Sequence, residues 1–118
     1  MIGSRRETPS VHDLMGTLST TRIELPGFPL GLFADASYEQ QEVRLQPGDF
    51  VLFFSDGLPE SFESRRVPDG DAVLRRLLAG ASAGTAQHLA HYLLRRLASA
   101  QRHRPLADDT TFLVLRIL

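Results

Sequence analysis

The 118-residue sequence predicts an α+β fold in which an antiparallel β-sheet is covered by two amphipathic helices. Two apolar segments, Phe50–Ser55 and Phe112–Leu118, are typical of buried strands because they are rich in aromatic and β-branched residues and follow turn formers. Between them, Ala72–Leu78 and Gly84–Ala100 repeat apolar residues at helical spacing. Each helix would therefore have one apolar face, and both faces need a sheet to cover.

The composition indicates an ordinary globular protein of one domain. The net charge of -1 gives no reason to expect binding to nucleic acid or to an anionic membrane surface. The absence of cysteine excludes disulfides, thiol catalysis and zinc–thiolate sites, and the absence of lysine excludes a lysine nucleophile. No segment is apolar enough for a signal peptide or a membrane span, so we expect a cytoplasmic protein or a fragment of one.

The first part of the chain contains few signals of regular structure. Residues 1–19 are polar without a clear period, and we predict a poorly ordered arm or linker remnant there. Thr20–Leu25 alternates and predicts a short edge strand. Pro26–Gly31 contains prolines and glycines that would break a ladder, which predicts a loop. The apolar residues expected to pack this loop onto the body are Phe28, Leu30, Leu32 and Phe33.

A hairpin is predicted next. Tyr38–Gln46 alternates between polar and apolar residues, which is typical of a half-buried strand. In the turn that follows, Pro47 presets φ and Gly48 accepts a positive φ. Tyr38–Gln46 would then pair antiparallel with Phe50–Ser55, which would lie on the inside and be buried on both faces.

The helical region begins after a predicted surface loop, Leu58–Gly70. Asp69 or Asp71 could cap the first helix, and Gly80 is a suitable stop signal. Gly84-Thr85 opens the second helix. The apolar stripe of that helix is Ala86, Leu89, Ala90, Leu93, Leu94 and Leu97.

Asp56 and Asp108 are the candidates for chemistry. Asp56 follows one apolar strand and precedes Gly57, which permits a sharp turn, whereas Asp108 stands shortly before the last strand. If these strands are antiparallel neighbours, both carboxylates meet at one rim of the sheet. Oxygen ligands of this kind are what Mg²⁺ or Mn²⁺ prefers. The alternative is two unrelated turn aspartates.

Other polar residues have weaker claims. Asp109 adjoins the pair and could instead bond the local backbone in a turn. Glu60 and Glu63 are interpreted as solvated loop acids. His88 and His91 have the i, i+3 spacing of metal ligands, but no third ligand stands near them in the sequence.

The order of several motifs resembles one protein family. The motifs are Pro29-Leu30-Gly31-Leu32, Leu45-Gln46-Pro47-Gly48-Asp49, Phe53-Phe54-Ser55-Asp56-Gly57-Leu58-Pro59-Glu60, the two helices, and Asp108-Asp109-Thr110-Thr111-Phe112-Leu113-Val114-Leu115-Arg116. Together they resemble the metal-dependent 2C-type (PPM) serine/threonine phosphatases. The branch is the bacterial one of stage II sporulation protein E and of the stress phosphatases in sigma-factor regulation. The resemblance runs from about Leu25 to the last residue.

The resemblance implies a specific chemistry. It identifies Asp56 and Asp108 as ligands of a catalytic Mg²⁺ or Mn²⁺, with Gly57 and Asp109 adjacent to them. In that family a two-metal cluster activates a bridging water that attacks phosphorus in line. The implied substrate is phosphoserine or phosphothreonine on an anti-anti-sigma protein. The implied fold is half of an α-β-β-α sandwich, with residues 20–118 as the C-terminal part of the phosphatase domain.

The sequence also departs from the family. Nothing in Met1–Leu25 matches the N-terminal half that supplies the metal-bridging aspartate and a glycine carbonyl ligand; Asp13 is followed by Leu-Met. We therefore expect weak metal binding, no activity of the chain alone and an uncovered apolar sheet face. Self-association or pairing with an N-terminal half would cover that face. The alternative is a catalytically inactive module that binds a regulatory partner.

Overall fold

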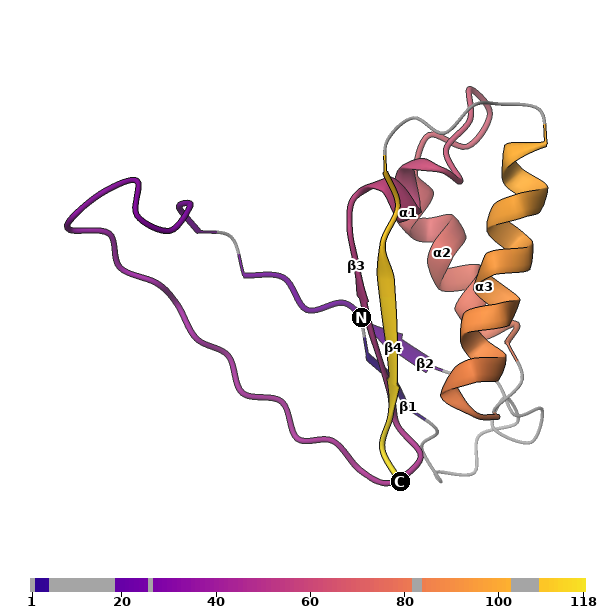
Figure 1. The fold of residues 1–118 in the computed structure, drawn as a ribbon, viewed down its shortest axis with the longest axis horizontal. Helices are drawn as coiled ribbons and strands as arrows, with labels where there is room; N and C mark the ends of the chain where they lie inside the picture. Colours follow the sequence, from indigo (N-terminus) through magenta and orange to yellow (C-terminus); the bar gives the residue numbers. More distant parts are fainter. Residues whose placement is uncertain (1, 5–18, 26, 82–83, 103–108) are drawn as a thin grey trace.

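The computed structural model describes residues 2–4, 19–25, 27–81, 84–102 and 109–118. Its centre is a four-stranded antiparallel sheet in the order β2-β1-β3-β4. The strands are β1 Ile2–Ser4, β2 Ser19–Thr21, β3 Phe50–Phe54 and β4 Phe112–Arg116. The helices are α1 Gly57–Glu60, α2 Gly70–Ala79 and α3 Ala86–Gln101. All three helices lie on one side of the sheet, which confirms the predicted α+β class (Figure 1).

The pairing of β3 with β4 positions the site. Each residue of β3 lies opposite one residue of β4, and Phe54 faces Phe112 at the end nearest α1. The ladder continues one step further, because the Ser55 amide donates to the Thr111 carbonyl oxygen at 2.9 Å. The C-terminal end of β3 and the N-terminal end of β4 therefore lie side by side, which meets the condition set by the sequence for a shared rim.

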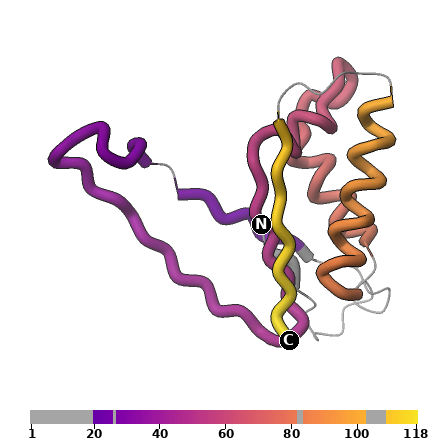
Figure 2. Tube along the Cα trace, viewed as in Figure 1, coloured from indigo at the N-terminus to yellow at the C-terminus, as the bar shows by residue number. Residues whose placement is uncertain are grey.

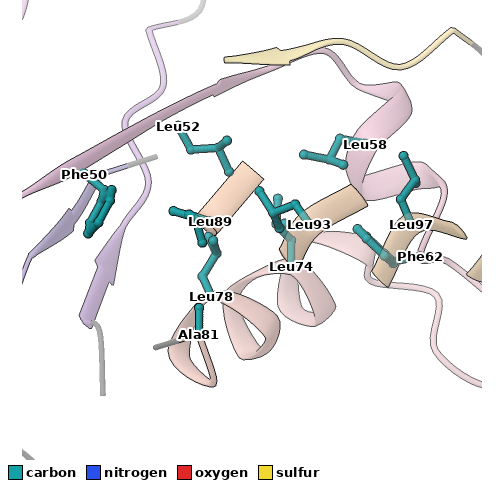
Figure 3. Packing of buried hydrophobic residues seen from close by; sticks show 10 residues of the cluster. All are labelled: Phe50, Leu52, Leu58, Phe62, Leu74, Leu78, Ala81, Leu89, Leu93 and Leu97. Atoms are coloured by element: carbon teal, nitrogen blue, oxygen red, sulfur yellow. The ribbon is translucent and has the colours of Figure 1, made fainter. Parts of the chain in front are cut away.

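The core lies between the sheet and the helices (Figure 3). Its buried members are Phe50, Leu52, Leu58, Phe62, Leu74, Leu78, Ala81, Leu89, Leu93 and Leu97. The predicted α3 stripe is confirmed in part: Leu94 is 51% exposed. No helix in the described part of the chain is both long and apolar enough to cross a membrane.

The predicted cap and stop residues of the helices are confirmed, although α2 begins at Gly70 and not at Ala72, and α3 begins at Ala86 and not at Gly84. The Asp69 carboxylate accepts a hydrogen bond from the Ala72 amide at 3.1 Å, and the Thr85 hydroxyl accepts one from the His88 amide at 3.1 Å. Both caps satisfy amides that have no partner within their helix. Gly80 is the C-cap of α2.

The predicted surface loop Leu58–Gly70 is wrong in its first half. Gly57–Glu60 forms α1, and Leu58 and Phe62 are buried against α2 and α3. These two side chains are four residues apart, so one turn of helix brings both to the same face. The proline within α1 occupies the first turn, where its missing amide proton costs no helical hydrogen bond.

The predicted hairpin strand Tyr38–Gln46 is also wrong. No part of it is a strand, and its side chains are exposed as it runs away from the body (Figure 2). The predicted turn does form: the Asp49 amide donates to the Gln46 carbonyl at 3.0 Å, and Gly48 has φ 93°.

The edge of β3 where Tyr38–Gln46 would pair is occupied by β1. Ile2 lies opposite Val51 and Gly3 opposite Phe50 in an antiparallel register. The sequence predicted no strand in residues 2–4, because three residues are too few to show a period. Residues 5–18 of the predicted arm lie outside the described residues.

The predicted packed loop after Pro26 is wrong as well. All four of its apolar side chains are exposed; Phe28 and Phe33 contact each other edge to face, with ring centroids 5.1 Å apart. Of the strand predicted at Thr20–Leu25, β2 includes only the first two residues. The radius of gyration of 16.2 Å exceeds the roughly 13.5 Å of a compact domain of this length, consistent with this extended course.

One sheet face is uncovered, as expected. Phe53 and Leu113 face each other across the β3–β4 pair and are 55% and 56% exposed, and Leu115 on the same side of β4 is also exposed. Because side chains alternate along a strand, this face is opposite the helices. The C-terminal half of β3 is therefore buried on one face only, not on both.

Candidate functional site

Asp56 lies at the rim of the sheet, between β3 and α1. The rigid β3–β4 pair ends one residue before it, and its exposed side chain makes no capping hydrogen bond to α1. An aspartate that only began a helix would bond a backbone amide there, as Asp69 does for α2. The carboxylate of Asp56 is thus directed to solvent from a fixed backbone, as a metal ligand would be.

The chain entering β4 passes directly against Gly57. A Cβ at this position would overlap the carbonyl oxygen of Asp109 and would lie 2.9 Å from Oγ1 of Thr110. The Thr111 amide donates to Oγ of Ser55 at 3.0 Å, which adds a side-chain link to the ladder. Residues 109–111 are therefore held beside the end of β3.

The structure brings together only part of the predicted pair. Asp109 is exposed and lies beside the rim, where its backbone is close to Gly57. Asp108 lies outside the described residues, so its assignment as a second metal ligand of Asp56 stays a prediction. The same holds for the alternative in which these aspartates only form turns.

A hollow of about 400 Å³ adjoins Asp56. It is lined by Arg22, Asp56, Pro59, Glu60, Glu63, Pro68, Asp69 and Asp71. The two glutamates, interpreted from sequence as solvated loop acids, therefore share a surface with the candidate ligand. The excess of carboxylates suits a cation more than an anion.

The fit of this surface to a metal is partial. Carboxylate oxygen is the ligand that Mg²⁺ and Mn²⁺ prefer, and Asp56 supplies one such group. Within the described ranges, however, no group of three histidine, aspartate or glutamate side chains is arranged to hold a metal ion. The described residues therefore supply part of a coordination shell at most.

Sequence reasoning missed one element of this surface. Arg22, just after β2, forms an ion pair with Asp71 on α2, and the same guanidinium lies 3.6 Å from Glu24. The pair ties the end of β2 to the helix layer. No local pattern signals a contact across so many residues. From the sequence, Asp71 was only a possible cap of the first helix, a role that Asp69 takes.

The two histidines proposed as weak metal candidates lie elsewhere. His88 and His91 line a second hollow on α3, with Ala81 and Leu89 at its base. Leu89 packs near Ala81, whereas Leu97 packs near Leu58 and Phe62 (Figure 3). The first turns of α3 are therefore at the end of the helix layer away from α1 and Asp56 (Figure 1).

Solved structures with this arrangement of sheet and helices are PP2C-type phosphatase domains, of which the chain covers a part. The manganese-presoaked phosphatase domain of the cell fate determinant SpoIIE from Bacillus subtilis is similar, with a TM-score of 0.57 and 27% identity over 75% of this chain and 38% of that chain. The PP2C phosphatase domain of SpoIIE with a fragment of its regulatory domain has a TM-score of 0.67 over 80% of this chain and 27% of that chain. At 24% identity the second similarity shows the fold alone.

Sequence comparison identifies the family. The sequence model of the family described as stage II sporulation protein E (SpoIIE) matches residues 10–118. The phosphoserine phosphatase RsbU of Bacillus subtilis (strain 168) is 32% identical over 99 residues, which are 80% of this chain and 28% of RsbU. The chain belongs to the SpoIIE family, and it spans less than a third of the RsbU sequence that it matches.

Proposed function

We propose that this chain is the C-terminal part of a metal-dependent phosphoprotein phosphatase domain, formed by residues 20–118. The observation that carries the proposal is that the exposed side chain of Asp56 makes no capping hydrogen bond. It lies at the rim where the chain entering β4 touches Gly57. Asp56 and Asp108 would hold one Mg²⁺ or Mn²⁺ there. A metal held there would supply positive charge for the phosphoryl oxygens and would activate a water for attack on phosphorus.

The proposed substrate is phosphoserine or phosphothreonine on a regulatory protein. Support comes from RsbU, which is named as a phosphoserine phosphatase. From the resemblance of the sequence motifs to the sigma-factor stress phosphatases, we infer an anti-anti-sigma type of substrate and a place in cytoplasmic sigma-factor signalling.

The proposed activity needs a further protein segment that covers the exposed face of the sheet. Phe53, Leu113 and Leu115 form an exposed apolar face on the side of the sheet opposite the helices. An N-terminal half of the domain, or a second copy of this chain, would bury that face. We infer that the chain alone binds metal weakly and does not turn over substrate.

The second candidate is a non-catalytic module that keeps the fold and a partner surface. It is favoured by the absence of any three-ligand group among the described residues. The two candidates differ in whether activity appears when an N-terminal half of the domain is supplied.

The first experiment locates the metal. Mn²⁺ is titrated into the ¹⁵N-labelled chain, and paramagnetic broadening is expected in amides 55–57 and 109–111. Asp56→Asn should abolish that broadening. The matched control Asp35→Asn removes the same charge from an exposed residue on the extended segment and should leave the broadening unchanged. Broadening that survives Asp56→Asn would exclude Asp56 as a ligand.

The second experiment tests turnover. Manganese-dependent hydrolysis of p-nitrophenyl phosphate is measured with the chain alone and with an N-terminal half of a SpoIIE-family phosphatase domain added. Activity only in the mixture, lost in Asp56→Asn, is expected of the enzyme. A stable complex of the two pieces that remains inactive would favour the binding module.

A further inference from the structure

The second hollow, on α3, has a chemistry that the proposed phosphatase site does not use. It has a volume of about 250 Å³ and is lined by Ala81, His88, Leu89, His91, Tyr92 and Arg95. We propose that it binds an oxyanion of the phosphate class.

The side chains of this hollow converge because of helical spacing. His88 and His91 are three residues apart, and Arg95 follows His91 by four, so all three lie along one face of α3. Each is exposed at the surface, whereas Ala81 and Leu89 beneath them are buried. The hollow therefore has an apolar base and nitrogen donors at its mouth.

Every charged or titratable group at the mouth can donate. An imidazole donates from at least one ring nitrogen, and the guanidinium of Arg95 presents five N–H groups in a fixed fork that matches phosphate oxygens. The hydroxyl of Tyr92 donates to the Leu77 carbonyl at 2.8 Å, so Tyr92 offers its ring as a wall. Among the described residues that line the hollow, none is a carboxylate.

The positive charge here has no counter-charge on its own helix. The sequence of α3 contains neither aspartate nor glutamate, although the whole chain has a net charge of -1. Among the described residues, the ion pairs within 4.0 Å are those of Arg22, so Arg95 is not neutralised by one of them. Arg96 adds charge nearby, with its guanidinium carbon 5.3 Å from the Tyr92 ring centroid.

Gly84 positions one of the donors. A Cβ at Gly84 would lie 2.9 Å from Nδ1 of His88, so the imidazole packs against the glycine backbone. The amide of His88 is held as well, by the Thr85 hydroxyl. The ring is thus kept over the first turn of α3, where the helix dipole is also favourable to an anion.

A transition metal is the other ligand that two histidines could suggest. A stable site needs further ligands, and the described part of the chain contains no group of three histidine, aspartate or glutamate side chains suited to a metal. The guanidinium of Arg95 at the same hollow would also repel a cation. These observations favour an anion.

The test uses the full ¹⁵N-labelled chain with EDTA, so that no metal at Asp56 can recruit phosphate. Inorganic phosphate is titrated at constant ionic strength, balanced with chloride. We expect saturable amide shifts confined to Ala81 and the first half of α3. Arg95→Gln should weaken the affinity roughly 5- to 10-fold, since a charge-assisted fork is lost at an exposed site.

Two further variants separate the site from general charge. Arg75→Gln removes one positive charge from an exposed residue of α2 and should leave the affinity unchanged. Gly84→Ala changes no charge but displaces the His88 ring, and should weaken binding about 2- to 5-fold. A phosphoserine peptide titrated in parallel identifies the source: binding at least as tight as that of inorganic phosphate indicates a phosphoprotein, and weaker binding indicates the free ion.

The proposal is overturned by any of three results. The first is the absence of saturable shifts in the hollow. The second is an equal effect of Arg95→Gln and Arg75→Gln, which would mean non-specific charge attraction. The third is saturation of the His88 and His91 signals by Zn²⁺ in a sample without EDTA, while phosphate has no effect on them. All these substitutions are at surface or loop positions, and circular dichroism checks that each variant is folded.

Discussion

Replacing Gly57 with alanine should destabilise the protein, because the chain entering β4 lies directly against this glycine. A Cβ there would overlap the carbonyl oxygen of Asp109 and would lie 3.1 Å from the carbonyl carbon of the same residue. The third neighbour, Oγ1 of Thr110, would be 2.9 Å away. Two of the three atoms belong to the backbone, so they can move only if the segment leading into β4 moves with them.

The expected magnitude is the balance of two effects. Gly57 belongs to α1 and does not have a positive φ, so alanine would gain up to about 1 kcal/mol of helix propensity. Overpacking against buried atoms costs roughly 1–3 kcal/mol. The gain is reduced at the first residue of so short a helix. We therefore expect a net loss of about 1–2 kcal/mol in the free energy of unfolding, and a fall in Tm of roughly 4 °C for each kcal/mol.

The assay is urea denaturation followed by circular dichroism, with thermal unfolding alongside. Gly80→Ala is the matched control: it has the same chemical change at the end of α2, but the nearest atoms to its new Cβ are 3.6 Å away or more. That variant should stay within about 0.5 kcal/mol of the unsubstituted chain. A Gly57→Ala protein as stable as the Gly80→Ala control would refute the close approach of β4 to the rim.

Three further perturbations test the packing, the capping and the uncovered face. Leu93→Ala, at a side chain with no exposure, should cost about 2–5 kcal/mol in urea denaturation, whereas Leu94→Ala, half exposed one residue later, should cost under about 1 kcal/mol; equal losses would contradict the orientation of α3. Asp69→Ala should lose about 0.5–2 kcal/mol of stability because its cap on the Ala72 amide is removed, and the exposed, non-capping Asp35→Ala should lose almost none by the same measurement. Leu113→Ser should reduce self-association measured by sedimentation velocity, because it removes apolar area from the uncovered face, while Leu30→Ser on the extended segment serves as control; association that is insensitive to Leu113→Ser would place the contact elsewhere.

Local signals were enough to predict the two long helices and the strands β3 and β4. Asp69, Thr85 and Gly80 delimit helices through bonds to residues within four positions, so the sequence contains both partners of each cap. β3 and β4 were predicted as strands because both segments are apolar and follow turn residues, whereas their antiparallel pairing was only a condition that the structure then showed. Given that pair, the chain entering β4 must pass close to Asp56, whatever the other strands do.

Non-local contacts could not be predicted in this way. Leu58 and Phe62 resemble loop residues until α2 and α3 supply the surface that buries them. The Arg22–Asp71 ion pair joins segments far apart in the sequence. The hollow on α3 also depends on Ala81, which precedes the helix, so the histidine spacing alone did not indicate it.

The failed hairpin and the exposed sheet face have one physical cause. Alternation in Tyr38–Gln46 indicates side chains suited to a half-covered strand, but burial requires both a strand edge and a surface above the sheet. The neighbouring edge of β3 is paired with β1 at Phe50 and Val51, and the face that holds Phe53 and Leu113 is not covered. The helices bury one side of the sheet, and the described residues do not bury the other. An alternating segment therefore gains little apolar burial by pairing here.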